Sequence, residues 1–183
     1  MYRLFVSVEL PADVKSTLAR VAGDVPGARW LEPDELHLTV RFIGEVDGVV
    51  FDDVLAALDE VRLAPFALGL RGVGHFPPRG EPRILWAGVE RSAELIALHN
   101  KVESALIRVG VEPERRKFMP HVTIARLRGT PTRAVGSFIA MNGLYRSAPF
   151  AVRDFQLFSS NLSGKRAVHR QEAVYALERG GES

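Results

Sequence analysis

Two short segments of the chain repeat one pattern of residues that can carry out acid–base chemistry. His37-Leu38-Thr39-Val40 and His121-Val122-Thr123-Ile124 each place a threonine two residues after a histidine, with aliphatic residues in the other two positions. Alternate residues of a β-strand point to the same side, so each His–Thr pair shares one face and the aliphatic residues take the other. We expect the aliphatic faces to be buried and the two polar faces to converge on one cleft.

Two histidines with two threonines suit the transfer of a phosphodiester between oxygen atoms. Imidazole titrates near pH 6.5, so one of His37 and His121 can accept a proton from the attacking water or hydroxyl while the other protonates the leaving oxygen. Because displacement at phosphorus is in line, the two rings should flank the phosphate from opposite sides. The hydroxyls of Thr39 and Thr123 can donate hydrogen bonds to the non-bridging oxygens in the transition state.

A metal site is the competing interpretation of these histidines. Neither His37 nor His121 has a second histidine or a carboxylate at metal-ligand spacing, because the residue two positions on is threonine in both segments. We therefore predict no metal and no cofactor. A further alternative is that both histidines are structural, with the threonine hydroxyls bonded to nearby backbone.

Composition limits the class of protein. The 183 residues are 46% apolar and 25% charged, which is typical of one soluble domain or of two small lobes that share a core. The absence of cysteine excludes disulfides, a thiol nucleophile and thiolate metal sites. No apolar run approaches the roughly 18–20 residues that cross a bilayer, and residues 1–9 are typical of a strand and not of a signal peptide. We expect a cytoplasmic protein that does not bind membranes.

Hydrophobic periodicity predicts strands that alternate with helices along the chain. Strands are expected at about 2–9, 36–43, 65–74, 83–90, 121–127, 149–159 and 167–178, with a short extended piece around Trp30. Helices are expected from Pro11 to about residue 22, at about 50–62, from a Ser92 cap to about residue 109, and at about 132–141. Residues 179–183 are expected to fray.

The order of these elements repeats. Helices and strands follow His121 at nearly the same intervals as they follow His37, which predicts an internal duplication with a period of 84 residues. We expect one α+β domain over residues 1–178, built as two pseudo-symmetric lobes with antiparallel-rich sheets, helices on the outer faces and a central cleft. A doubly wound parallel sheet also fits the pattern, but adjacent strand pairs at 65–74/83–90 and 149–159/167–178 favour hairpins.

The sequence resembles the 2H phosphoesterases, and more narrowly the RNA 2′,3′-cyclic phosphodiesterases, also called 2′-5′ RNA ligases. The resemblance covers about residues 1–178. It is carried by the segments from Arg29 to Glu45 and from Phe118 to Arg126, with support from the segments from Pro82 to Val89 and from Phe155 to Ser160. It implies a metal-independent hydrolase that opens 2′,3′-cyclic phosphate ends of RNA, including tRNA fragments, to 2′-phosphomonoesters. A related 2′-5′ ligation is also implied.

The resemblance also implies roles for single residues. His37 would donate a proton to the leaving oxygen and His121 would activate water, while Thr39, Thr123 and Arg126 would bind phosphate. Strict alternation places Arg126 on the face opposite His121, so either the strand bulges or the side chain wraps around its end. The first segment has Phe42 at the position equivalent to Arg126, and His169 stands where relatives often carry an aromatic residue.

Other side chains are candidates for contacts with substrate, each with a structural alternative. Arg115, Arg116 and Lys117 could hold an RNA backbone or belong to a solvated loop. Arg41 is predicted to share the face of His37 and could line the cleft or lie on the surface. Trp30 and Phe76 could stack on a base or pack in the core. For His75 an exposed loop position is expected, and for His99 a half-buried structural one.

Alternative functions remain open at this point. The same chemistry could act on a small cyclic nucleotide, for which a closed pocket would be expected instead of a groove. A non-catalytic RNA-binding or nucleotide-binding module is the alternative from another class, and it would be expected to have lost a histidine. Because one chain can enclose the cleft, we expect a monomer.

Overall fold

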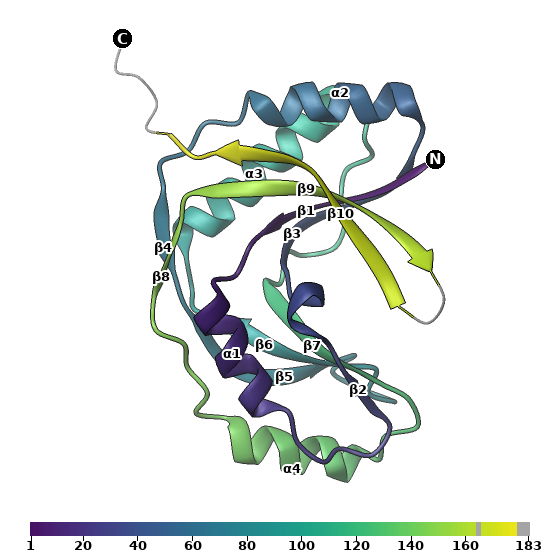
Figure 1. The fold of residues 1–183 in the computed structure, drawn as a ribbon, viewed down its shortest axis with the longest axis vertical. Coiled ribbons are helices and arrows are strands. Elements are labelled where there is room, and N and C mark those ends of the chain that lie inside the picture. Colours follow the sequence, from purple (N-terminus) through teal and green to yellow (C-terminus); the bar gives the residue numbers. More distant parts are fainter. Residues whose placement is uncertain (164–165, 179–183) are drawn as a thin grey trace.

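The computed structural model describes residues 1–163 and 166–178, so the tail predicted to fray lies outside the described residues (Figure 1). The strands are β1 (Tyr2–Val8), β2 (Ala28–Trp30), β3 (Leu38–Val46), β4 (Phe66–Leu68), β5 (Leu70–Phe76), β6 (Ile84–Val89), β7 (His121–Leu127), β8 (Phe150–Val152), β9 (Asp154–Ser163) and β10 (Arg166–Ala176). The helices are α1 (Ala12–Val21), α2 (Gly48–Asp59), α3 (Ala93–Arg108) and α4 (Thr132–Asn142), with a 3₁₀ turn, η1, at Pro33–Glu35.

Most of the strands form one antiparallel sheet in the order β10-β9-β1-β3-β7-β6-β5, with β2 paired to β7 on a side branch. The join between β3 and β7 is narrow, because the only residues that pair there within the described chain are Leu38 and Val122. The sheet therefore divides into two lobes, one with β10, β9, β1 and β3 and the other with β7, β6, β5 and β2. The expected α+β architecture is confirmed, and the parallel alternative is wrong.

The helices cover the two lobes separately (Figure 1). α2 packs against α3, and α3 packs against β3 in the first lobe. In the second lobe α4 packs against β5, and the hydroxyl of Thr17 on α1 lies 2.9 Å from that of Tyr145, just after α4. The expected placement of helices on outer faces is thus what the structure has.

Helix starts follow local capping chemistry. The side chain of Asp47 accepts a hydrogen bond from the Val50 amide at the start of α2, and Ser92 accepts one from the Leu95 amide at the start of α3, as its sequence position predicts. The apolar stripe of α3, which includes Leu98 and Val102, is fully buried.

Element boundaries differ from the predicted ones at three places. The strand expected over 65–74 is broken into β4 and β5 at Gly69, and the strand expected over 149–159 is divided in the same way between β8 and β9. η1 was not expected; the carboxylate of Glu35 folds back to accept the backbone N–H of Glu32 in a capping box. This turn delays the start of β3, so His37 lies just before the strand.

The expected duplication is supported by the element positions. The first residues of α2 and α4 (Gly48 and Thr132), of β4 and β8 (Phe66 and Phe150), and of β5 and β9 (Leu70 and Asp154) are separated by the same 84 residues as His37 and His121. Each lobe nevertheless takes strands from both halves of the sequence, since β9 joins β1 and β3. We propose that residues 1–178 are a single domain that arose by duplication of a unit of this length.

Candidate active site

The candidate site is built around the join between the lobes. Because Leu38 and Val122 pair in antiparallel register and are fully buried, their neighbours project to the opposite face of the sheet. In this register His37 lies opposite Thr123, and Thr39 lies opposite His121. Diagonal neighbours across an antiparallel pair are about 7–8 Å apart, a separation that leaves room for a phosphate between the two imidazoles.

A β-bulge at the same point in both strands reorients the residues that follow. Ser7 and Val6 of β1 pair with Thr39 and Arg41, so Val40 is an extra residue in β3. Trp86 and Leu85 of β6 pair with Thr123 and Ala125, which makes Ile124 the extra residue in β7. A bulge shifts the alternation of side chains by one residue. This shift brings Phe42 and Arg126 to the face of the histidines. Of the two expected ways in which Arg126 could reach that face, the structure has the bulge.

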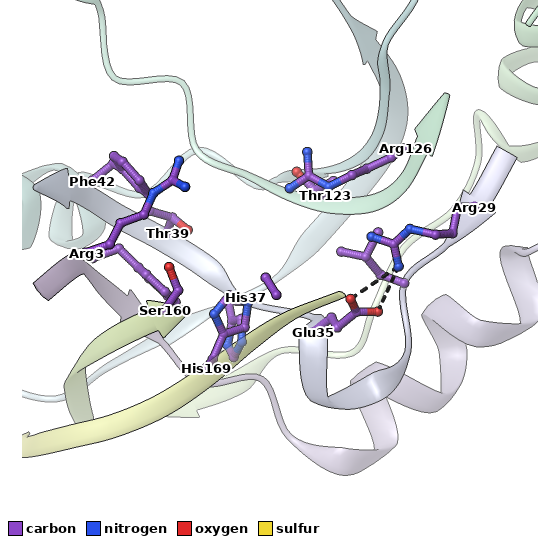
Figure 2. A pocket seen from close by; sticks show the side chains of 13 residues that line it. Arg3, Arg29, Glu35, His37, Thr39, Phe42, Thr123, Arg126, Ser160 and His169 are labelled. Atoms are coloured by element: carbon purple, nitrogen blue, oxygen red, sulfur yellow. Dashed lines mark hydrogen bonds and ion pairs between the residues drawn. The ribbon is translucent and has the colours of Figure 1, made fainter. Parts of the chain in front are cut away.

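A cavity of about 540 Å³ opens on this face. Figure 2 shows His37 and His169 beside each other at one side of it, Thr39 and Ser160 on one flank, and Thr123 and Arg126 on another. The lining also includes Arg3, Phe5, Arg29, Leu31, Glu35, Phe42 and Ala167. Five basic or imidazole side chains against one carboxylate make this a cavity suited to an anion.

His37 is held in a cage of rings. Its centroid lies 5.0 Å from that of Phe158, 5.1 Å from that of His169 and 5.7 Å from that of Phe5. Neither of its ring nitrogens has a hydrogen-bond partner of regular geometry among the described residues. Burial, and next the charges of His169 and Lys15, lower the pKa of His37 to about 4, against the opposing effect of the Asp34 backbone and carboxylate. In the ligand-free protein His37 is thus neutral at pH 7.

His121 has a different environment at the edge of this site. Its Nδ1 lies 2.7 Å from the carbonyl oxygen of Met119. A carbonyl only accepts, so Nδ1 carries the proton and Nε2 of the neutral ring is free to accept one. Phe76 contacts the ring edge-on at 4.9 Å, and Trp86 lies 6.5 Å away. His121 does not line the 540 Å³ cavity, but it lies on the same strand face as Thr123, which does line it.

The indole of Trp86 packs directly against the backbone of Gly74 on the neighbouring strand β5. A Cβ at Gly74, which pairs with Trp86, would lie 2.2 Å from the indole. Only glycine at position 74 therefore leaves room for the indole in its place next to His121 and Phe76. This aromatic wall on the side of the second histidine parallels the cage around the first.

The charged groups on the two sides of the cavity are partly paired (Figure 2). Arg29 contacts the buried carboxylate of Glu35 at 3.3 Å, and the guanidinium of Arg3 lies 5.5 Å from the ring centroid of Phe42. Arg126 projects toward the cavity from the side of Thr123 (Figure 2). All three arginines line the same cavity as Thr39 and Thr123.

The expected position of Arg41 is wrong. The bulge at Val40 turns Arg41 to the interior, where it is 5% exposed and donates to Glu103 on α3 and to the carbonyls of Phe42 and Glu112. Burial acts to raise the pKa of Glu103, but the hydrogen bonds from Arg41 and from the Glu114 amide outweigh it and lower this pKa below its usual value. Arg41 does not line the cavity; it connects the first histidine strand to the loop that leads to the second.

His99 supports the same region, as a half-buried structural residue. Its Nδ1 lies 2.9 Å from the carbonyl oxygen of Val40, and its ring stacks on Phe118 with centroids 4.0 Å apart. Phe118 immediately precedes Met119, whose carbonyl orients His121. One face of α3 therefore holds both the first bulge and the approach to the second histidine.

The remaining predicted contacts are not brought into the cavity. Arg115, Arg116 and Lys117 are exposed on the loop before β7, where Arg116 pairs with Glu114 at 3.1 Å. Trp30 points away from the cavity, since its Nε1 donates to the Gly23 carbonyl and its ring packs on Phe138 of α4. A contact of Trp30 with substrate is therefore not supported, whereas Phe76 lies against His121.

Several lining residues were not singled out from the sequence. Arg29 and Ser160 lie within the segments that carry the family resemblance, which is a usable signal for them. Phe158, whose ring contacts His37, lies within such a segment as well. Phe5 and Arg3 reach the site only because β1 pairs with both β3 and β9, and no local pattern marks them.

The chain matches the model of the LigT-like phosphoesterases over residues 8–86 and 88–169. The chain belongs to the LigT-like phosphoesterase family. An RNA 2′,3′-cyclic phosphodiesterase of Archaeoglobus fulgidus is 32% identical to it over 177 residues, which cover 94% of this chain and 99% of that relative. The expected resemblance to 2H phosphoesterases is thus confirmed.

Two solved structures share the fold. The crystal structure of TT0787 of Thermus thermophilus matches with a TM-score of 0.83 and 26% identity, over 98% of this chain and 100% of that one. Escherichia coli LigT complexed with 3′-AMP matches with a TM-score of 0.76 and 25% identity, over 97% and 99% of the two chains.

Two searches of the described residues bear on ligands and membranes. No group of three or more histidine, aspartate or glutamate side chains gathers there as a metal site would require. Of the helices in the same part of the chain, none combines the length and the apolar character needed to span a bilayer.

Proposed function

We propose that this LigT-like phosphoesterase hydrolyses 2′,3′-cyclic phosphate ends of RNA to 2′-phosphomonoesters by acid–base catalysis with His37 and His121. The observation that supports it most is the pairing of Leu38 with Val122, which puts the two His–Thr pairs opposite each other on one face with the histidines diagonal. The relatives named RNA 2′,3′-cyclic phosphodiesterase support the reaction class.

In the proposed mechanism, His121 is the base. Its Nδ1–H is occupied by the Met119 carbonyl, so Nε2 takes a proton from water as the water oxygen attacks phosphorus. The bond from phosphorus to the ribose 3′ oxygen breaks, and His37 gives its proton to that oxygen. The 2′ oxygen keeps the phosphate.

The proposed mechanism requires that His37 be protonated when substrate is bound. A phosphate between Thr39 and Thr123 brings negative charge beside the ring, which favours imidazolium and raises the pKa of His37 from its ligand-free value of about 4. The hydroxyls of both threonines and the guanidinium of Arg126 would then hold the non-bridging oxygens, where charge grows in the transition state.

RNA is the proposed substrate because the cavity continues beyond the phosphate position. Arg3 and Arg29 line it on two sides and can contact further phosphates, while Phe42 is 41% exposed at its rim and offers a surface for a base. A 5′-hydroxyl RNA end in place of water would give the 2′-5′ ligation that the family resemblance implies. A small cyclic nucleotide remains the second candidate and needs no such extension.

A direct assay tests the proposal. Oligonucleotides that end in 2′,3′-cyclic phosphate are incubated with enzyme in excess chelator, and wild type is compared with His37→Asn and His121→Asn. In each variant kcat should fall about 10²–10⁴-fold. His75→Asn is the matched control, since His75 lies on β5 facing away from Phe76 and outside the cavity. Full activity in either site variant would refute the acid–base assignment, and loss of wild-type activity in chelator would favour a metal mechanism.

Product analysis separates the substrate alternatives. A 2′-phosphate product from the oligonucleotide, formed with higher kcat/KM than from 2′,3′-cyclic AMP, is the expected result. Equal kcat/KM for the mononucleotide would contradict RNA as the substrate. Adding an oligonucleotide with a free 5′-hydroxyl measures ligation in the same reaction.

A further inference from the structure

His169 lies beside His37, and the proposed reaction leaves it without a role. The two imidazoles are in edge-to-face contact, with centroids 5.1 Å apart and planes at 77°. Phe5 contacts both rings, and Phe158 contacts His37 from another side. Of the three rings around His37, His169 alone can carry a proton.

The two histidines line two cavities at once. Both line the 540 Å³ cavity with the threonines, and both line a second cavity of about 610 Å³, as Glu35 and Ala167 also do. The second cavity is further lined by Glu9, Lys15 and Gln171. The pair therefore borders both the substrate space and a second space with charged side chains, from which water can exchange protons.

Contact and burial set the protonation of this pair. The Nδ1 atoms of both rings are buried and lack a hydrogen-bond partner of regular geometry among the described residues. Two imidazolium ions in ring contact would repel strongly in such surroundings, whereas one proton shared by two rings would not.

We propose that His37 and His169 together hold a single proton when phosphate is bound, and that His169 drives this proton from His37 to the leaving oxygen. The inference rests on the proposed role of His37 as the acid. His169 acts through His37 and is therefore a positioning residue. No other assignment in the site uses its ionisable ring.

The proton balance of the proposed step is complete. The pair takes one proton from solvent as the phosphate binds. When the phosphorus–oxygen bond breaks, the N–H bond of His37 also breaks, its electron pair stays on nitrogen, and the new O–H bond forms on the leaving group. Because a stronger acid protonates the leaving oxygen more readily, a neighbour that disfavours imidazolium at His37 raises kcat.

Other charges around the pair act in both directions. Burial is the main cause that lowers the pKa of His169, and Arg126 adds to it, while Glu35 and Asp34 oppose both. Lys15 acts on His37 in the same direction as His169. Glu9 faces the pair from the second cavity, and Arg3 and Arg29 face it from the first.

The decisive measurement is the ring-proton NMR titration of wild type, His169→Asn and His37→Asn without substrate. In His169→Asn the titration midpoint of His37 should rise by roughly one pH unit, because a like charge is removed. In His37→Asn the midpoint of His169 should rise by the same amount, since coupling between two sites is reciprocal. Unchanged midpoints, or a midpoint that shifts in only one of the two variants, would overturn the inference.

Kinetics give a second readout that a purely structural role would not move. In His169→Asn the alkaline limb of the profile of kcat against pH should move to higher pH. The value of kcat at the pH optimum should fall roughly 3–10-fold, because His37 has become a weaker acid. His169→Phe preserves ring packing on Phe5 and should show the same kcat decrease; His75→Asn should show neither effect. A lower kcat with an unmoved pH profile would contradict the inference. If His37→Asn retained full activity, both the proposed function and this inference would fail. If His37→Asn were inactive and the titration midpoints did not move, the inference alone would fail.

Discussion

The Nδ1 atom of His99 donates a hydrogen bond of 2.9 Å to the carbonyl of Val40, the extra residue of the bulge beside Thr39. His99 is on α3, and its ring also stacks on Phe118, three residues before His121. One side chain thus contacts the segments that lead to both histidines. The separation of these histidines depends on elements that neither His–Thr segment contains.

Replacing His99 by phenylalanine should loosen the first bulge while keeping a ring on Phe118. Loss of one hydrogen bond should lower the free energy of unfolding by about 1 kcal/mol, and kcat should fall several-fold with KM nearly unchanged because Thr39 is less well fixed. Denaturant unfolding and steady-state kinetics measure the two effects. Tyr175→Phe, which removes a hydrogen bond to the Leu55 carbonyl away from the cavity, should affect stability alone. Equal kcat in both variants would contradict this role for His99.

The ion pair between the buried Arg41 and the half-buried Glu103 should matter for stability and not for substrate affinity. Arg41→Met removes the charged partner of Glu103, which keeps only the Glu114 amide, and should cost about 1–3 kcal/mol. The double change Arg41→Met/Glu103→Leu should recover much of this loss, because no unpaired charge remains. Chemical denaturation of the two single variants and the double variant measures the coupling. A rise in KM for Arg41→Met without loss of stability would indicate that Arg41 contacts substrate in the cleft, and would contradict its buried position.

Arg126 should contribute to binding of the phosphate. A hydrogen bond to a charged group is worth about 1.5–3 kcal/mol, so Arg126→Gln should weaken kcat/KM roughly 10–100-fold. Arg128→Gln is the matched control, since Arg128 is exposed two residues further on and does not line the cavity. Kinetics at several salt concentrations give the comparison. Similar losses in the two variants would indicate a general charge effect and not a phosphate contact.

The low pKa of His37 predicts a pH dependence of stability. The ring has a pKa of about 4 in the folded protein and 6.5 in the reference state, so the unfolded chain binds more protons between these values. The contribution is fully present above pH 6.5 and is lost as pH falls toward 4. At about 1.4 kcal/mol per pKa unit, the difference between 6.5 and about 4 amounts to roughly 3–3.5 kcal/mol.

Unfolding of wild type and His37→Asn between pH 7 and 4 checks this. The stability of wild type relative to the variant should decrease as pH falls through that window and level off below pH 4. A difference between the two proteins that does not vary with pH would show that the His37 ring is not protected from protonation by the fold.

Much of the site was predictable because its signals are local. Periods of two and 3.6 residues located the strands and helices, and the repeated His–Thr pattern identified four polar side chains of the candidate site. The faces of Arg41 and Arg126 were not predictable in the same way. A bulge depends on how β3 and β7 pair with β1 and β6, and a strand read alone is expected to alternate strictly.

The sequence by itself determined which chemical groups the two His–Thr segments supply, since two imidazoles and two hydroxyls at matched positions of a repeat are fixed by residue type and spacing. Only the tertiary structure decided which other groups act on them. His169 reaches His37 because β10 and β9 lie next to β1, although 132 positions separate the two residues in the chain. Contacts of this kind arise from strand pairing between distant segments, and pairing is set by the packing of the whole sheet and not by any local pattern.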